Sequence, residues 1–314
     1  MRKKPKIQLA SQRGAAIIVA LFVTALVVIA SVAMIERLRA DLSRTNLIMN
    51  DTKARLYAEG SIAWAMEQLN ANLKQKKPNT ITDMMPLQSP VDKIENAQVY
   101  SLIYDQEGLF NLNNLTDPET HQGFIQFIIA IEPTMKVDDI KNLIIALRDW
   151  ISPSGTNNQL DDYYAKQSPA YVAPHRPMVS ISELRLVKGM TSLLYAKLSP
   201  FVTALPEATK LNINSAPPQV LMSLSPGLSL EAATTIVNHR KQHPFTTTES
   251  FLQFDIVKNN HIDDKKINII SAYFLVKTSV KMAHQEKILY TLLHRILNNA
   301  QPIEIIVWQS KGTL

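Results

Sequence analysis

The stretch RGAAIIVALFVTALVVIASVAMI, residues 13–35, is the most uniformly apolar part of the chain. No charged residue lies between Ala15 and Ile35, and neither proline nor glycine interrupts that run. As an α-helix it spans about 30 Å, the thickness of the hydrocarbon layer of a bilayer. A soluble core helix is rarely apolar on all sides over this length. The sequence therefore predicts a transmembrane helix over residues 15–35.

The segment before this helix is strongly basic. It contains no acid and five cations, at Arg2, Lys3, Lys4, Lys6 and Arg13. By the positive-inside rule this favours a cytoplasmic N-terminus. The 314-residue chain has a net charge of +6, which falls to +1 without these cations. The body is thus nearly neutral and lacks the basic surface typical of nucleic-acid binding. Because the chain has no cysteine, disulfides, thiolate nucleophiles and cysteine metal sites are excluded.

A secretory signal peptide is the alternative interpretation of the opening. The triplet at 31–33, SVA, has the small residues of a signal peptidase site, and cleavage there would leave a soluble chain beginning near Met34. That chain would be a secreted enzyme. No Gly-x-Ser-x-Gly, P-loop or paired-carboxylate motif is present, so the sequence supplies no catalytic centre for this hypothesis.

The sequence Arg13-Gly14-Ala15-Ala16 before an apolar helix resembles the class III signal of type IV prepilins and type II secretion pseudopilins. The resemblance implies that a prepilin peptidase cleaves after Gly14 and N-methylates Ala15. Most such proteins have glutamate at the fifth mature position, where this chain has Val19. A carboxylate in lipid is costly unless it is paired, and a subunit at the filament tip has no neighbour above it to provide a partner. Val19 therefore suggests a tip subunit.

The helix is predicted to continue beyond the membrane. Charges appear from Glu36, and apolar residues recur at multiples of three and four until Pro78, which is expected to end the helix. A helix of about 60 residues is about 90 Å long. Its predicted packing positions are Leu38, Leu42, Met49, Leu56, Ile62, Met66, Leu69 and Leu73.

The region after Pro78 divides into strands, a long helical block and further strands. Residues 97–115 predict two short strands joined as a hairpin around Asp105–Gly108, and residues 267–310 predict three more strands. Between them lie seven predicted helical segments, at residues 123–131, 137–151, 181–190, 192–202, 216–225, 230–242 and 249–254. A sheet interrupted by helices suggests an inserted domain. The predicted parts are a leader (1–14), a transmembrane helix (15–35), a helix with the first strands (36–118), an all-helical insertion (119–265) and the last strands (266–314).

This α+β plan, with a long N-terminal helix on an antiparallel pilin-like sheet and a large helical insertion, resembles the K family of type II secretion minor pseudopilins. The resemblance covers nearly the whole chain. It implies a non-enzymatic protein of the bacterial inner membrane with a periplasmic globular part. It also implies a place at the pseudopilus tip with the I- and J-type minor pseudopilins, priming assembly for protein export across the outer membrane. The other implied partners are the major pseudopilin, the prepilin peptidase and the inner-membrane platform.

Residues 148–190 are similar to a family segment that contains Asp-Trp, an acidic loop, a Tyr-Tyr pair and a Ser-Glu-Leu helix start. Relatives bind calcium in their helical domain, and carboxylates suit this hard cation. The loop here departs from that pattern, because Ser152, Ser154 and Leu160 replace expected acids. The carboxylates that remain are Asp149, Asp161 and Asp162. No cofactor is expected to be required, and calcium is the one that the resemblance suggests. Ser180 or Ser182 is expected to cap a helix, with Glu183 nearby.

Two segments, residues 211–240 and 184–198, resemble helix–hairpin–helix units, which bind DNA phosphates through a pair of glycines. At the position of the second glycine, this chain has Ser229 in one segment and Thr191 in the other. A membrane-anchored DNA-binding protein is therefore the alternative function, although the nearly neutral body argues against nucleic acid as a partner. His239 and His243 lack the intervening glutamate of a zinc protease helix, so no zinc site is predicted there.

Overall fold

The computed structural model describes residues 12–74, 86–153, 155, 159–282, 285–296 and 303–311. The chain divides into two compact units, residues 1–56 and 57–314. Most of the predicted leader, together with Pro78 and Ser154, lies outside the described residues.

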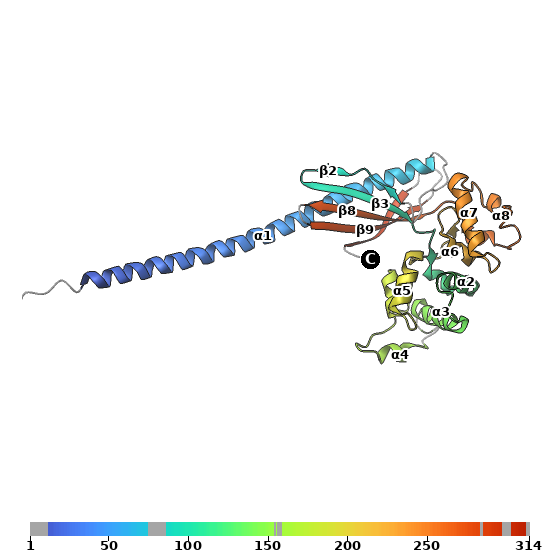
Figure 1. Cartoon of the computed structure of the whole chain (residues 1–314), viewed down its shortest axis with the longest axis horizontal. Coiled ribbons are helices and arrows are strands. Elements are labelled where there is room, and N and C mark those ends of the chain that lie inside the picture. The colour runs from blue at the N-terminus through green and yellow to red at the C-terminus, as the bar shows by residue number, and fades with distance from the viewer. Residues whose placement is uncertain are drawn as a thin grey trace, which may run out of the picture. The chain divides into compact units, whose positions relative to one another are not determined.

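The N-terminal helix is one continuous element. Helix α1 runs from Gln12 to Lys74, 63 residues, which confirms the predicted long helix (Figure 1). The Thr24 hydroxyl donates to the Leu21 carbonyl at 2.8 Å, and the Ser31 hydroxyl donates to the Val27 carbonyl at 2.7 Å. Both hydroxyls are thus satisfied within the helix, as a lipid environment requires. An 18-residue window of α1 has a mean hydropathy of 2.9 and none of it is buried, so by length and composition α1 can cross a membrane.

The C-terminal part of α1 belongs to the globular unit and buries one narrow stripe. Ala58, Ile62, Ala65 and Leu69 recur at helical spacing and are each at most 3% exposed. Ile62 and Leu69 were predicted from the apolar pattern. The two alanines were not, because alanine gives little hydrophobic signal, yet its small side chain allows close backbone approach. Arg295 from the sheet donates to the Leu69 carbonyl at 3.2 Å.

The described residues form a six-stranded antiparallel sheet. Its strand order is β1-β3-β8-β9-β10, with β2 also paired to β3. The strands are β1 (Leu87–Gln88), β2 (Asp92–Ile94), β3 (Ala97–Asp105), β8 (Tyr273–Met282), β9 (Gln285–Ile296) and β10 (Ile303–Lys311). The last three confirm the predicted C-terminal strands.

The predicted hairpin around Asp105–Gly108 is wrong. β3 pairs along its length with β8, from Ala97 opposite Met282 to Asp105 opposite Phe274. The residues after the turn form β4 (Phe110–Asn111), which instead pairs with β5 (Val202–Thr203). The turn residues Asp105–Gly108 thus lead the chain out of the sheet, and a strand far along the sequence takes the place of the expected partner.

The insertion between β3 and β8 is mostly helical. Two predicted helical segments are confirmed to the residue, at α3 and α7, whereas the segment predicted at 181–190 is a 3₁₀ turn over Ile181–Leu186 and α4 was not predicted. The α-helices are α2 (His121–Ile131), α3 (Val137–Ile151), α4 (Asp161–Ala165), α5 (Ser192–Leu198), α6 (Pro218–Leu221), α7 (Leu230–Gln242) and α8 (Thr248–Leu252). In the described part of the insertion they are accompanied by the 3₁₀ turns η2 (Leu112–Thr116), η3 (Pro118–Thr120), η4 (Ile181–Leu186), η5 (Ser199–Phe201), η6 (Met222–Leu224) and η7 (Asp264–Lys266).

The insertion is not all-helical, which corrects the prediction. Besides β4–β5, a second short parallel ladder joins β6 (Leu211–Asn212) to β7 (Ile267–Asn268). The first ladder ties the start of the insertion to its middle, and the second ties the middle to its end. Two-residue strands give too little alternation to be recognised in a sequence. The predicted limits at 119 and 265 remain predictions, while the strands of the large sheet end at Asp105 and resume at Tyr273.

The insertion has a hydrophobic core of its own, built around aromatic rings. Phe110 stacks on Phe127 with ring centroids 5.2 Å apart, and Phe124 tilts against both. Trp150 meets the fully buried Tyr164 edge-on at 5.4 Å. Such pairs stabilise a core beyond the area that they bury. The helices around them are therefore held rigidly enough to position the loops described below.

Candidate assembly surface and acidic loop

The predicted processing site lies at the start of α1. Gly14 and Ala15 are in its first turns, and the helix runs unbroken through Ser31–Ala33, the alternative signal peptidase site. Val19, at the position where most pilin-like proteins have glutamate, is 60% exposed on the apolar helix. Cleavage and methylation at Gly14 and Ala15 remain predictions.

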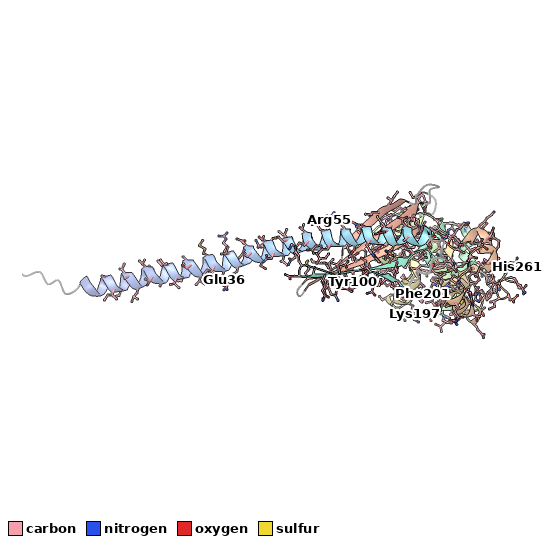
Figure 2. The ribbon with its side chains drawn as sticks, turned by 90° about the horizontal axis from the view of Figure 1, so that it is seen from above. Glu36, Arg55, Tyr100, Lys197, Phe201 and His261 are labelled. Carbon is pink, nitrogen blue, oxygen red and sulfur yellow. The ribbon has the colours of Figure 1, made fainter. Side chains whose placement is uncertain are left out.

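The N-terminal unit presents apolar side chains without any cover in the single chain. Figure 2 shows them around the helix on both sides of Glu36. Beyond the charge-free segment, four of the predicted packing positions are exposed by 53–59% and recur at helical spacing. We call them the apolar stripe: Leu38, Leu42, Met49 and Leu56. Large apolar side chains exposed in a row are typical of a protein or membrane contact.

The acidic loop after α3 is organised around His175. Asp149 is buried, and its Oδ1 accepts a hydrogen bond from the Gln159 amide at 2.9 Å. His175 Nδ1 lies 3.0 Å from the Asp149 carbonyl oxygen, and its Nε2 lies 2.8 Å from Asp161 Oδ1. Since both neighbours are acceptors, both ring nitrogens must donate, as in an imidazolium. The loop is thus closed by the His175–Asp161 ion pair, which no sequence motif indicates.

The charge on His175 follows from its surroundings. Burial alone lowers the pKa of His175, but the hydrogen bond to Asp161 and the nearby carboxylate charges outweigh it, so the pKa is raised from its ordinary value. Burial raises the pKa of Asp149. His175 also has φ +47°, a backbone conformation that non-glycine residues rarely adopt. The loop holds it there, because both of its ring nitrogens are engaged.

The described residues do not fit a calcium site well. Asp149 Oδ2 is buried and has no hydrogen-bond partner among the described residues, so this oxygen is available as a metal ligand. Asp161 is already paired with His175, and Asp162 is exposed. Within the described part of the chain, no three acidic or histidine side chains gather around one point that a metal ion could occupy. Calcium takes six to eight oxygen ligands, so the carboxylates of Asp149 and Asp161 would need carbonyl and water oxygens beside them.

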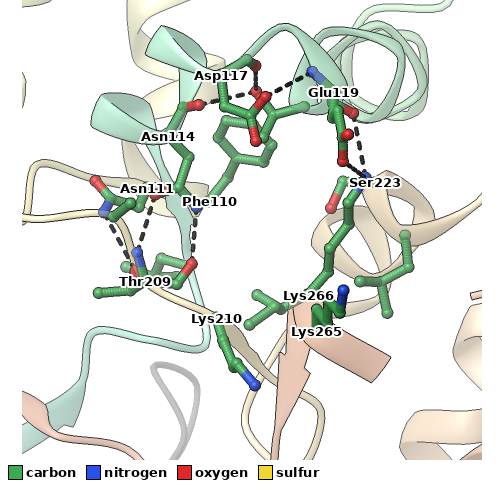
Figure 3. A pocket seen from close by; sticks show the side chains of 15 residues that line it. Phe110, Asn111, Asn114, Asp117, Glu119, Thr209, Lys210, Ser223, Lys265 and Lys266 are labelled. Atoms are coloured by element: carbon green, nitrogen blue, oxygen red, sulfur yellow. Dashed lines mark hydrogen bonds and ion pairs between the residues drawn. The ribbon is translucent and has the colours of Figure 1, made fainter. Parts of the chain in front are cut away.

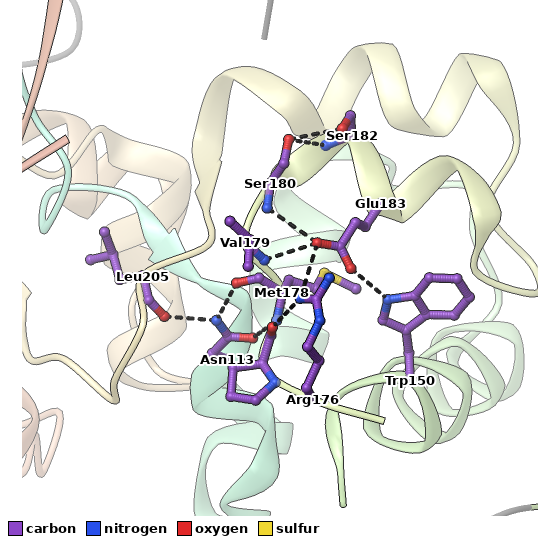
Figure 4. A network of polar contacts seen from close by, with 10 residues as sticks. Asn113, Trp150, Arg176, Met178, Val179, Ser180, Ser182, Glu183 and Leu205 are labelled. Carbon is purple, nitrogen blue, oxygen red and sulfur yellow. Dashed lines mark hydrogen bonds and ion pairs between the residues drawn. The ribbon is translucent and has the colours of Figure 1, made fainter. Parts of the chain in front are cut away.

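Glu183 organises the loop that follows. Ser180 and Glu183 form a complete capping box at the start of η4, which confirms the predicted cap. Glu183 also accepts from the Trp150 indole at 3.1 Å and from the Val179 amide at 2.9 Å (Figure 4). Next to it, the Asn113 amide bridges Met178 and Leu205. These contacts fix the loop to α3 and to the start of the insertion.

A cavity of about 270 Å³ lies beside η3 and η7 (Figure 3). Its wall is a hydrogen-bonded seam in which Asn114 both donates to the Thr209 carbonyl and accepts from the Thr209 amide, at 2.8 and 3.0 Å. Glu119 pairs with Lys266 at 3.8 Å across the opening. Because these polar groups are paired with one another, we interpret the cavity as a gap between packed segments.

The two hairpin segments use the second-glycine positions for helix capping. The Ser229 side chain accepts from the Ala232 amide at the start of α7, and Thr191 accepts from the Leu194 amide at the start of α5. These hydroxyls satisfy helix ends that a DNA phosphate would otherwise meet. Assignment of both segments as helix–hairpin–helix units remains a prediction.

Comparison with known proteins gives concordant matches. Two family models, both described as type II secretion system (T2SS) protein K, match residues 108–207 and 211–267, together half of the chain. The type II secretion system protein K of Pseudomonas aeruginosa is 28% identical over 90% of this chain and 89% of its own length. That of Klebsiella pneumoniae is 29% identical over 77% of this chain and 79% of its own.

A solved structure has the same fold. It comes from the GspK–GspI–GspJ complex of the enterotoxigenic Escherichia coli type 2 secretion system, with a TM-score of 0.72. The match covers 86% of this chain and all of that one, at 21% sequence identity.

Proposed function

Since this chain belongs to the type II secretion system protein K family and is a minor pseudopilin, we propose that it forms the tip of the periplasmic pseudopilus. There it joins the I- and J-type minor pseudopilins, primes assembly and supports export across the outer membrane. The observation that carries this proposal is the shared fold with a chain from a complex of these three types. Its work is assembly rather than catalysis.

The insertion supports the tip position on steric grounds. β3 and β8 are neighbours in the sheet, yet the chain between Asp105 and Tyr273 forms a domain with its own core. In a filament shaft, every subunit has neighbours above and below, and so large a domain at the end of the sheet would obstruct them. A tip subunit has one open side. The apolar Val19 agrees with this, because a tip subunit has no amine above it to neutralise a carboxylate.

The membrane arrangement follows from the N-terminal segment. The apolar helix is consistent with a membrane anchor. We place it in the inner membrane as a single span, with the basic leader in the cytoplasm and the globular unit in the periplasm. The prepilin peptidase then cleaves between Gly14 and Ala15. The inner-membrane platform and the major pseudopilin are the further partners of the processed chain, while nucleic acid is not one.

The apolar stripe is the proposed contact with the I- and J-type subunits. Replacing Leu42 and Met49 together by glutamate places two charges in that contact, and we expect the dissociation constant of the three-subunit complex to rise at least 30-fold, about 2 kcal/mol. Full-length proteins in detergent, measured by size-exclusion chromatography and titration, give the value.

The matched control is Ala40→Glu, which adds one charge on the opposite side of the same helix. It should change the dissociation constant by less than about threefold, as expected for a residue outside the contact. Equal effects of the two variants would show that general charge, and not the stripe, governs binding. An unchanged dissociation constant for the double variant would remove the stripe from the interface.

Calcium is proposed to be dispensable for this chain, because the His175–Asp161 ion pair already balances charge in the acidic loop. We expect the melting temperature of the full chain to agree within about 2 °C in EDTA and in millimolar calcium. A calcium-dependent rise above about 5 °C, abolished by Asp149→Asn, would instead establish a calcium site that includes this carboxylate.

A further inference from the structure

Two buried carboxylates lie where the chain leaves the sheet for the insertion. Asp105 is the last residue of β3 and is fully buried. Its Oδ1 accepts from the Glu107 amide at 2.9 Å. Its Oδ2 accepts from the Ser271 hydroxyl at 2.7 Å and from the Asn212 amide group at 3.0 Å. One carboxylate thus joins the exit from the sheet, the middle of the insertion and the return to β8.

Glu107 makes a second connection across the same junction. It is 4% exposed, its Oε1 accepts from the Ala272 amide at 3.0 Å, and its Oε2 accepts from Asn268 Nδ2 at 3.0 Å. Its own carbonyl accepts from the Asn212 amide at 2.8 Å. Glu107 therefore holds together the two ends of the insertion, at the point where both join the sheet.

The charged groups around the pair are unequally distributed. Arg240 of α7 is buried, donates to the Ile213 carbonyl, and interacts electrostatically with Asp105. On the sheet side, Arg295 donates to the Ser271 carbonyl. Nearby, Glu207 accepts from the Tyr273 hydroxyl at 2.6 Å and lies 3.9 Å from His294 Nε2, so its charge is engaged there. Asp105 thus has a cation nearby, whereas the described groups that act on Glu107 are amide donors and the negative charge of Asp105.

We propose that Glu107 is a proton-controlled latch between the pilin-like sheet and the insertion, closed when its carboxyl is protonated and loosened when it ionises. Asn268 provides the means. Its Oδ1 is buried and has no hydrogen-bond partner among the described residues, and an amide turned by 180° presents that oxygen to a protonated Glu107. The protonated carboxyl then donates to Asn268 while still accepting from Ala272.

The electrostatics give the pH range. Burial, followed by the charge of Asp105, raises the pKa of Glu107 from 4.5 to about 7 against the effect of its hydrogen bonds. Burial also raises the pKa of Asp105. The closed junction therefore binds a proton that the opened junction releases. Its stability is greatest below about pH 4.5, falls as the pH rises towards 7, and stays low above that. This behaviour is independent of which partners the protein has.

The natural chain has no cysteine, which allows clean site-specific labelling. Gln98→Cys in β3 and Lys241→Cys in α7, both exposed positions, place one spin label on the sheet and one on the insertion. In the full chain in detergent, we expect a narrow distribution of label distances near pH 5 and a broader one near pH 8. The equilibrium constant for unfolding should be about 10- to 100-fold larger near pH 8 than near pH 5.

Glu107→Gln keeps the shape and a neutral side chain, so its distance distribution should stay narrow at both pH values. Glu119→Gln, at an exposed acid of the insertion, is the matched control and should behave as the unmodified chain. The latch is refuted if the unmodified chain shows the same distribution at both pH values, or if Glu107→Gln still broadens. If Glu107→Gln does not fold, the midpoint of broadening in the unmodified chain decides: a midpoint above about pH 5 supports the latch, and one below it refutes the latch.

Discussion

The Gly14→Asp chain is expected to keep its full leader and to abolish secretion of the exported proteins. Gly14 stands between a cationic leader and an apolar helix, where the prepilin peptidase is proposed to cleave. An aspartate there puts a side chain and a negative charge at the scissile bond and at the edge of the membrane, where burial of a charge is costly. An uncleaved leader also keeps five cations on the cytoplasmic side, which prevents the helix from leaving the membrane.

Intact mass spectrometry of the membrane-purified protein measures the processing, and the level of exported protein in the medium measures the function. The unmodified chain should begin at N-methylated Ala15. Gly60→Asp is the matched control, since Gly60 is an exposed glycine of the same helix with open space around it, and it should be processed normally. Trimming of Gly14→Asp to Ala15 would contradict the account, and an unmodified chain beginning near Met34 would make the protein a secreted one.

Replacement of Asn113 by leucine is expected to destabilise the insertion by about 3 to 5 kcal/mol. Asn113 is 5% exposed, and its Nδ2 donates to the carbonyls of Met178 and Leu205 at 3.0 and 2.7 Å. Its Oδ1 accepts from the Met178 amide at 2.9 Å. Leucine fills a similar volume but leaves these three buried backbone groups without partners, each at a cost of about 1 to 3 kcal/mol.

Urea unfolding of the full chain in detergent, followed by tryptophan fluorescence, measures this effect because Trp150 lies in the same network. Asn238→Leu, at an exposed position of α7, is the control and should change the free energy of unfolding by less than about 0.5 kcal/mol. A loss below about 1 kcal/mol for Asn113→Leu would show that water replaces the lost hydrogen bonds. Cleavage at Gly14 should be unaffected, because Asn113 lies outside α1.

The elements that depend on local pattern could be predicted from the sequence. The boundaries of α3 and α7 follow from helical periodicity, and β8, β9 and β10 follow from dense apolar and β-branched residues. The partner of β3 could not be predicted, because β8 lies far along the chain and strand pairing over such a separation leaves no local signal. The local pattern favours the residues around Phe110 instead, because the turn residues Asp105–Gly108 separate two short strand-like runs.

The site residues show the same division. The capping role of Ser180 follows from the Ser-x-x-Glu spacing. His175 gave no such signal, because its partners Asp149 and Asp161 meet it only after the loop folds. Asp105 and Glu107 had the appearance of polar turn residues, and their burial depends on Asn212, Ser271 and Asn268 from distant segments. The buried Ala58 and Ala65 were missed because small residues contribute little to an apolar pattern.

The position of the protein at the pseudopilus tip is the central claim, and end-labelling tests it most directly. A pseudopilus assembled with the full natural chain is labelled with an antibody against the insertion and viewed by electron microscopy. We predict a label at one end of each filament and none along the shaft. Label distributed along the shaft would contradict the account, because it would place the insertion between stacked subunits.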